Sequence, residues 1–317
     1  NFYQKRGNTM LTKLSQLLEP NHYPSPVPAA VVHPTTDIVL KSCIEAKAHN
    51  IINPILIGAR HKIEQAAASA NLDISGYTLI DAEHSHQAVA IAAKMARDKQ
   101  VNFVIKGDVH TDELMAVFVD KSQNLRTERR MSHVWLMQSP IYHKLLTLTD
   151  CALNVTPDLL DKKDILQNAI NFAHTLGVHQ PKVAILAAVE EVKPQMPSTI
   201  DAAALCKMAD RGQITGAILD GPLAFDNAIS QASADIKHIH SSVTGDVDIL
   251  LVPDLEAGNM LGKQLIYLGG AKAAGIVMGA KIPIVLTSRA DDEMDRLYSI
   301  ALGAWVAKSN PSFSSII

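Results

Sequence analysis

The residues best suited to chemistry form one short run, Thr287-Ser288-Arg289, between an apolar segment and a helix-like stretch rich in acids. The first turn of a helix has N–H groups without partners and a partial positive charge, so a hydroxyl and a guanidinium beside it can hold phosphate. A capped helix whose acids suit the helix dipole explains the same residues equally well. Arg289 is the exception, because a cation at a helix start opposes the dipole and needs an anionic partner.

A second group of candidate residues follows the apolar segment 102–105. Lys106 could hold an anion, and Thr111 could cap the next helix while facing the same anion. Arg126 adds a cation in a polar loop further on, whereas Arg129 and Arg130 are better explained as part of a solvated loop.

Two further runs each join a strand-like segment to a helix-like one. Gly258 would let a ligand approach the backbone closely, but a loop capped by Asn259 accounts equally well for the same residues. Asp220-Gly221-Pro222 is ordinary turn chemistry, and we interpret it as a structural strand-to-helix turn.

The composition excludes several classes of protein. The chain has 29 basic and 32 acidic residues without a basic stripe, so nucleic acid is not expected as a partner. The histidines lack an HExxH-type spacing, and GxGxxG and P-loop motifs are absent, which argues against a metal site, a Rossmann nucleotide site and a P-loop kinase.

Cys43, Cys151 and Cys206 lie far apart, which predicts isolated reduced thiols. No long apolar run or signal core occurs, so we expect a cytoplasmic protein without a membrane partner.

The elements that must position these residues alternate between short β-rich runs and longer helical segments. A strand at 29–33 and a helix at 36–49 begin the first series, while 133–138 and 145–148 predict a hairpin. Helices are expected at 157–176 and 260–274 in a second series, and at 290–306 at the end of the chain. This rhythm predicts an α/β fold with mainly parallel sheets, in which ligands bind beyond the carboxyl ends of the strands.

Taken together and in this order, these segments resemble the phosphate acetyltransferase and phosphate butyryltransferase family. The stretch 248–301 carries the resemblance most specifically, and the whole resemblance spans residues 12–310. The segments concerned are Lys106-Gly107-Asp108-Val109-His110-Thr111, Arg126-Thr127, Met131-Ser132-His133-Val134, Asp220-Gly221-Pro222-Leu223-Ala224, Asp254-Leu255-Glu256-Ala257-Gly258-Asn259 and Pro283-Ile284-Val285-Leu286-Thr287-Ser288-Arg289-Ala290-Asp291.

The resemblance implies two α/β/α domains that flank a cleft, in a fold similar to that of the isocitrate dehydrogenase group. We expect residues 1–148 and 280–317 to form the first domain, because the C-terminal segment returns to it, and residues 149–279 to form the second. The family works without a metal or an organic cofactor and usually forms homodimers.

The reaction implied is the exchange of a short acyl group between coenzyme A and phosphate. Matching the family motif, Asp295 is the expected base for the coenzyme A thiol; seven residues separate it from Ser288, which would put both on one helix face. Ser288 would hydrogen-bond the developing charge or the thiol, and Arg289 would hold phosphate. The expected substrate-binding residues are Lys106, His110, Thr111, Arg126, Ser132, Gly258, Asn259 and Thr287.

The sequence departs from the family pattern at one position, which bears on the coenzyme A contact and on the choice of acyl group. Tyr267 stands where acetyltransferases often carry an arginine, and the residues 287–291 lean toward butyryltransferase-like members. Two alternatives remain open at this point: a metal-dependent dehydrogenase of the isocitrate dehydrogenase-like fold, and a non-catalytic module that binds coenzyme A.

Overall fold

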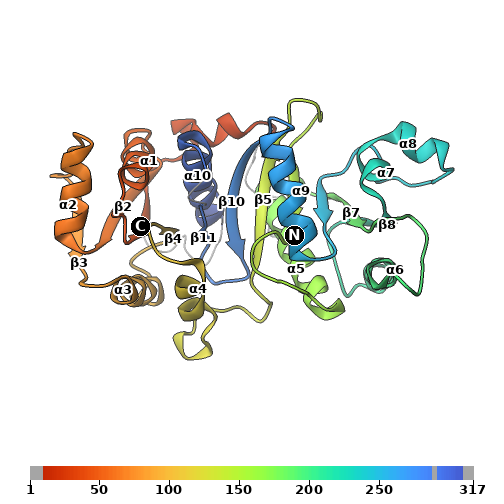
Figure 1. The fold of residues 1–317 in the computed structure, drawn as a ribbon, viewed down its shortest axis with the longest axis horizontal. Helices are drawn as coiled ribbons and strands as arrows, with labels where there is room; N and C mark the ends of the chain where they lie inside the picture. The colour runs from red at the N-terminus through yellow and green to blue at the C-terminus, as the bar shows by residue number, and fades with distance from the viewer. Residues whose placement is uncertain (1–9, 288–290, 310–317) are drawn as a thin grey trace. The chain divides into compact units, whose positions relative to one another are not determined.

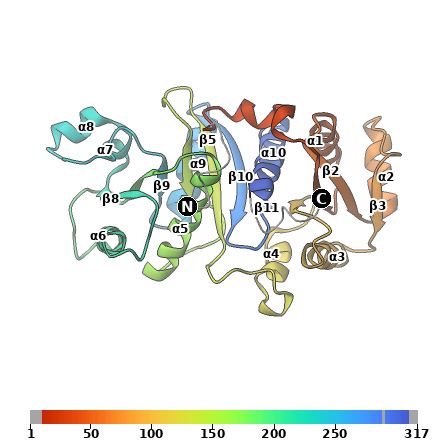
Figure 2. The same ribbon diagram turned by 180° about the vertical axis from the view of Figure 1, so that it is seen from behind.

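The computed structural model describes residues 10–287 and 291–309, which form two compact units (Figures 1 and 2). The N-terminal unit comprises Ser15–Met131 and the described chain from Ala273 onward. The central unit comprises Ser132–Lys272 and the described residues up to Leu14. The C-terminal segment therefore groups with the first part of the chain, but the boundaries differ from the expected ones at 148 and 280. The hairpin 132–149 groups with the central unit because its second strand pairs with a strand at 249–251.

In the N-terminal unit the strand order is β3-β2-β1-β4-β11-β10, and all neighbours are parallel except β11 and β10. Helices α1, α2 and α10 lie on one face of this sheet, and α3 and α4 lie on the other (Figures 1 and 2). The strands are β1 (Val27–Val32), β2 (Ile52–Gly58), β3 (Thr78–Asp81), β4 (Phe103–Lys106), β10 (Lys272–Met278) and β11 (Ile284–Val285), and the α-helices are α1 (Asp37–Ala48), α2 (Arg60–Ser69), α3 (Ser85–Arg97), α4 (Thr111–Val119) and α10 (Glu293–Ser309).

In the central unit the strand order is β5-β6-β9-β7-β8, and only the β5–β6 hairpin is antiparallel. The strands are β5 (Ser132–Gln138), β6 (Leu146–Thr149), β7 (Lys182–Leu186), β8 (Ile218–Leu223) and β9 (Ile249–Leu251), and the helices are α5 (Leu159–Thr175), α6 (Pro197–Asp210), α7 (Phe225–Ile229), α8 (Gln231–Ile236) and α9 (Leu255–Tyr267). The prediction of an α/β fold with mainly parallel strands is confirmed.

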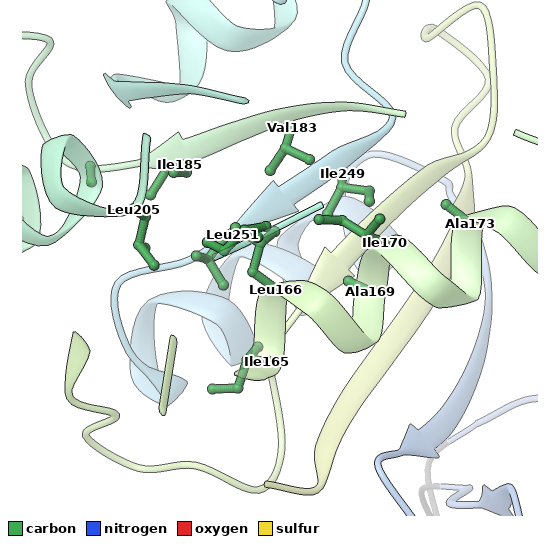
Figure 3. Packing of buried hydrophobic residues seen from close by; sticks show 12 residues of the cluster. Ile165, Leu166, Ala169, Ile170, Ala173, Val183, Ile185, Leu205, Ile249 and Leu251 are labelled. Carbon is green, nitrogen blue, oxygen red and sulfur yellow. The ribbon is translucent and has the colours of Figure 1, made fainter. Parts of the chain in front are cut away.

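The core of the central unit forms where α5 packs on its sheet (Figure 3). Ile165, Ala169 and Ala173 recur every four residues, so they line one side of the helix and face the buried strand residues Val183 and Ile249. Apolar β-branched strands covered by such a helix are typical of parallel sheets, which are buried on both faces.

Two expected elements are wrong in extent. The helix predicted at 260–274 ends at Tyr267, because Gly269 and Gly270 follow and Gly270 has a positive φ of 67°. The alanines after them belong to β10, a strand that the prediction missed because alanine-rich sequence is typical of helices. The supposed turn Asp220-Gly221-Pro222 lies within β8, where proline is tolerated because β8 is the last strand of its unit.

Candidate functional site

The candidate site in the N-terminal unit is built where β4 and β11 end side by side. The two strands are parallel, with Val104 opposite Ile284 and Ile105 opposite Val285. Lys106 is the last residue of β4, and Thr287 comes two residues after β11, so both leave the sheet at the same edge. Each is only 7% exposed. A sheet edge of this kind is where ligands bind in α/β proteins.

Helix α10 carries Asp295 in its first turn, and the Asp295 side chain is 7% exposed. Its Oδ1 atom accepts a hydrogen bond of 3.2 Å from the backbone N–H of Ala273, the first residue after Lys272 in β10. The helix begins at Glu293, and Asp291 and Asp292 precede it. The helix expected at 290–306 therefore begins later than predicted.

Arg296 is a buried cation that the sequence prediction did not include. Its guanidinium Nη1 donates to Thr287 Oγ1 at 3.1 Å, and its Nε donates to the Asp291 carbonyl at 3.4 Å. Arg296 thus holds the residues on both sides of 288–290. Ser288 and Arg289, the other two predicted catalytic residues, lie outside the described residues. The reasoning that singled out Arg289, a cation at a helix start, would also have found Arg296.

The loop after β4 is fixed to the loop after β1 by Asp108. Its carboxylate accepts hydrogen bonds from the Thr35 backbone N–H at 2.9 Å, from Thr35 Oγ1 at 3.2 Å and from Thr36 Oγ1 at 3.1 Å. Gly107 makes the approach possible, since a Cβ there would overlap the Val32 carbonyl and lie 2.8 Å from the His33 carbonyl. The ends of β1 and β4 therefore form one supported surface beside Lys106.

The remaining predicted residues of this unit lie nearby in the chain but differ in exposure. His110 is exposed and is the N-cap of α4, although its side chain makes no capping bond, and Thr111 is the first helical residue rather than the cap. Arg126 donates to the Val119 carbonyl at 3.3 Å and pairs through its backbone with Ala280. This contact fixes the Arg126 loop on the turn between β10 and β11.

Ser132, Gly258 and Asn259, the other predicted substrate-binding residues, belong to the central unit. Ser132 is fully buried and accepts a hydrogen bond of 2.9 Å from Asn168 of α5. Asn259 donates to the Cys151 carbonyl at 3.2 Å, and a Cβ at Gly258 would lie 2.7 Å from the Asp150 carbonyl. The expected Asn259 cap is wrong, because Asp254 caps α9 by accepting from the Ala257 N–H at 2.8 Å.

The Asp150 turn, on which Gly258 and Asn259 pack, is itself a buried polar centre. The Asp150 carboxylate accepts hydrogen bonds from the N–H groups of Ala152 and Leu153 and from the amide of Asn154. Burial lowers the pKa of the adjacent His133 to about 4, although the negative Asp150 opposes the shift. His133 is therefore neutral near pH 7, and its Nδ1 atom is buried without a hydrogen-bond partner among the described residues.

The three thiols are poor nucleophiles in this fold. Burial raises the pKa of Cys43 and of Cys206 to about 12, and it raises the pKa of Cys151 well above the ordinary value. All three are free cysteines. Because the thiolate is the reactive form, these side chains are unsuited to covalent catalysis at neutral pH.

Within residues 10–287 and 291–309, the structure contains no group of three or more His, Cys, Asp and Glu side chains arranged to hold a metal ion. Among the helices of the same residues, none combines the length and the apolar composition needed to cross a membrane.

Comparison with known proteins shows which family has similar sequences. A family model described as phosphate acetyl/butaryl transferase matches residues 82–304. The phosphate acetyltransferase of Rickettsia felis is 52% identical over 89% of this chain and 81% of its own length. The phosphate butyryltransferase of Clostridium acetobutylicum is 40% identical over 85% of this chain and 89% of its own length.

A solved structure is also similar over most of this chain. The branched-chain phosphotransacylase of Enterococcus faecalis superimposes with a TM-score of 0.77 at 27% identity, covering 88% of this chain and 99% of the solved chain.

Proposed function

The chain belongs to the phosphate acetyl/butyryl transferase family, and we propose on this premise that it transfers a short acyl group reversibly between coenzyme A and inorganic phosphate. The observation that carries the proposal is the family match over residues 82–304, which contains Lys106, Thr287 and Asp295. These three residues lie in the unit whose sheet edge is suited to ligand binding.

In the proposed reaction the sulfur of coenzyme A attacks the carbonyl carbon of an acyl phosphate directly. The carbon–sulfur bond forms, the bond from the carbonyl carbon to the phosphate oxygen breaks, and its electron pair leaves with phosphate. The thiol must lose its proton before or during attack, and Asp295 is the proposed acceptor. Direct attack is supported by the raised thiol pKa values of Cys43, Cys151 and Cys206, which disfavour an acyl-cysteine intermediate.

The proposed binding roles follow the charges that the reaction develops. Arg289 holds the phosphate through its planar fork, Ser288 hydrogen-bonds the developing charge or the thiol, and Lys106 contributes a further cation. If Arg289 holds phosphate, Arg289→Ala should raise KM for acyl phosphate and Arg289→Lys should restore it only in part. Unchanged KM values for both variants would remove Arg289 from phosphate binding.

We further propose that the enzyme acts in the cytoplasm as a homodimer and needs no cofactor beyond coenzyme A as substrate. Light scattering at the assay concentration should give twice the chain mass of 34.3 kDa. A mass equal to a single chain would contradict the proposed dimer without affecting the proposed reaction.

The test of the function is an assay of acyl transfer that depends on both coenzyme A and phosphate. Acetyl, propionyl and butyryl donors should be compared at equal concentrations, because relatives of both the acetyl and the butyryl class match the chain. Transfer with at least one donor is expected. Binding of coenzyme A without any acyl exchange would identify a non-catalytic module instead.

A further inference from the structure

Helix α10 lies beside β10 in the N-terminal unit and is joined to it by side-chain hydrogen bonds (Figures 1 and 2). The short strand β11 pairs with residues 276–277 of β10, and the N–H groups that concern us lie before this pairing. The N–H of Ala273 donates to Asp295 Oδ1 at 3.2 Å. The N–H of Gly275 donates to Ser299 Oγ at 3.0 Å. Buried backbone N–H groups need acceptors, so these two bonds link the strand to the helix.

Ser299 completes a closed circuit of hydrogen bonds around Asp295. Its hydroxyl donates to the Asp295 backbone carbonyl, one helical turn earlier, at 2.8 Å. A serine hydroxyl can donate one hydrogen bond while it accepts others, so the same oxygen also serves Gly275. The carboxylate and the carbonyl of Asp295 are therefore tied to the same short segment of β10.

The circuit is buried. Ser299 is 2% exposed, and the residues 300–304 that follow it in α10 are buried and apolar. Serine is less favourable than alanine in the interior of a helix, and a bond to the carbonyl four residues earlier slightly destabilises the helix. The contribution of a hydroxyl at this position is therefore its bond to Gly275, which alanine could not form.

The start of α10 restrains Asp295 from the other side. The Asp292 carboxylate accepts a hydrogen bond of 2.8 Å from the Asp295 N–H, which is the bond that an N-cap residue forms. The N–H, the carboxylate and the carbonyl of Asp295 thus each have a partner from a different place in the chain.

We propose that Ser299 is a positioning residue for the reaction, because it keeps β10 where the Ala273 N–H can hold the Asp295 carboxylate. The inference rests on the proposed function, in which this carboxylate accepts the proton of coenzyme A. Without the Ser299 hydroxyl, the Gly275 N–H loses its acceptor and the strand segment is no longer fixed to the helix. A misplacement of about 1 Å at a reacting group can cost about 10²-fold in rate.

Steady-state kinetics provide the first test. Ser299→Ala should lower kcat about tenfold and leave KM for acyl phosphate unchanged, because the carboxylate is proposed to act on the thiol. Ser42→Ala is the matched control: Ser42 is 1% exposed, and its hydroxyl donates to the Ile38 carbonyl four residues earlier in α1 at 2.9 Å. Both variants should melt a few degrees below wild type, but Ser42→Ala should keep its kcat.

A double-mutant cycle separates positioning of Asp295 from a general effect on the fold. Asp295→Asn keeps an acceptor for the Ala273 N–H but removes the proposed base. If Ser299 acts through this base, Ser299→Ala should cause little further fall in kcat in the Asp295→Asn background. An equal tenfold fall in both backgrounds would overturn the proposal and leave the proposed function intact.

Amide hydrogen exchange, followed by NMR, tests the circuit without relying on activity. Ser299→Ala should accelerate exchange at Gly275, which loses its acceptor, and also at Ala273, whereas Ser42→Ala should accelerate neither. Unchanged exchange at Ala273 in Ser299→Ala would overturn the proposal. In a protein without acyl transfer the proposed function fails, and faster exchange at Ala273 then still supports the circuit.

Discussion

The carboxylate of Asp295 combines burial with a position in the first turn of α10. It accepts the Ala273 N–H on one oxygen, which fixes its orientation toward the adjacent strand. A base held in one orientation loses less entropy in the transition state than a mobile one. Mutation of Asp295 is therefore a direct test of its proposed role as the base.

We predict that Asp295→Asn lowers kcat about 10²- to 10⁴-fold with little change in KM, because general base catalysis contributes in this range and asparagine keeps the acceptor for Ala273. Steady-state kinetics in the direction of acyl-CoA synthesis measure the effect. Glu293→Gln changes an exposed carboxylate in the same helical turn and should leave kcat unaltered. An Asp295→Asn variant with normal turnover across pH would exclude Asp295 as the base.

The hydrogen bond between Arg296 and Thr287 predicts a positioning effect at the site. Thr287→Val keeps the shape of the side chain but removes the acceptor for Arg296, which leaves a buried donor without this partner. We expect kcat to fall about tenfold, while the melting temperature changes by only a few degrees.

Thr78→Val, a change at an exposed position of β3, is the control for this experiment and should alter neither quantity. If Thr287→Val left kcat unchanged, the contact with Arg296 would have a structural role only.

Buried His133 predicts how stability depends on pH. Its pKa is about 4 in the folded protein and near 6.5 in the unfolded chain, so the unfolded state binds more protons between these values. This contribution, on the order of 3 kcal/mol, is fully present above pH 6.5 and is lost as pH falls toward 4.

Melting temperatures between pH 7 and pH 4.5 check this prediction. His133→Gln should show a flatter decline than wild type, whereas His179→Gln, which changes an exposed histidine of the same unit, should follow wild type. Parallel curves for wild type and His133→Gln would show that other groups cause the acid sensitivity.

At the level of elements, the β1 and β4 ends can meet only because Gly107 lacks a side chain. Gly107→Ala would drive a Cβ into the carbonyls of Val32 and His33, which are backbone atoms and cannot turn away. We predict a loss of about 1–3 kcal/mol in the free energy of unfolding, measured by denaturant titration. Gly76→Ala is the matched control, since nothing lies within 4 Å of the added Cβ, and it should be neutral. Equal stability of both variants would contradict the packing described.

At the level of the whole molecule, we predict catalysis without a metal ion, because cationic side chains can offset the charge of phosphate instead. Lys106 and Arg126 are cations in the unit that holds Asp295, and Arg289 adds a third charge in the sequence, so positive side chains are available for phosphate. We predict that activity survives dialysis against excess chelator and that added divalent cations do not increase it. Activity lost on dialysis and restored by a divalent cation would contradict this prediction and favour the metal-dependent alternative.

The alternation of short apolar runs with helical periodicity was sufficient to predict the α/β fold with mainly parallel strands, because such patterns record which side chains are buried. The motifs around Lys106 and 287–295 were sufficient for the family, since several of them agree in order. The same patterns failed at β10, where Ala273 and Ala274 favour helix locally but pair within a sheet in the folded chain.

Only the tertiary structure brings β11 beside β4, and with it Thr287 beside Lys106. It also turns Arg296 toward Thr287 and brings Ser299 of α10 to the Gly275 N–H of β10. Periodicity identifies the buried face of an element but carries no information about the neighbour that buries it. Strand order depends on pairing between distant segments, so the residues that lie together at a sheet edge are decided by the fold as a whole.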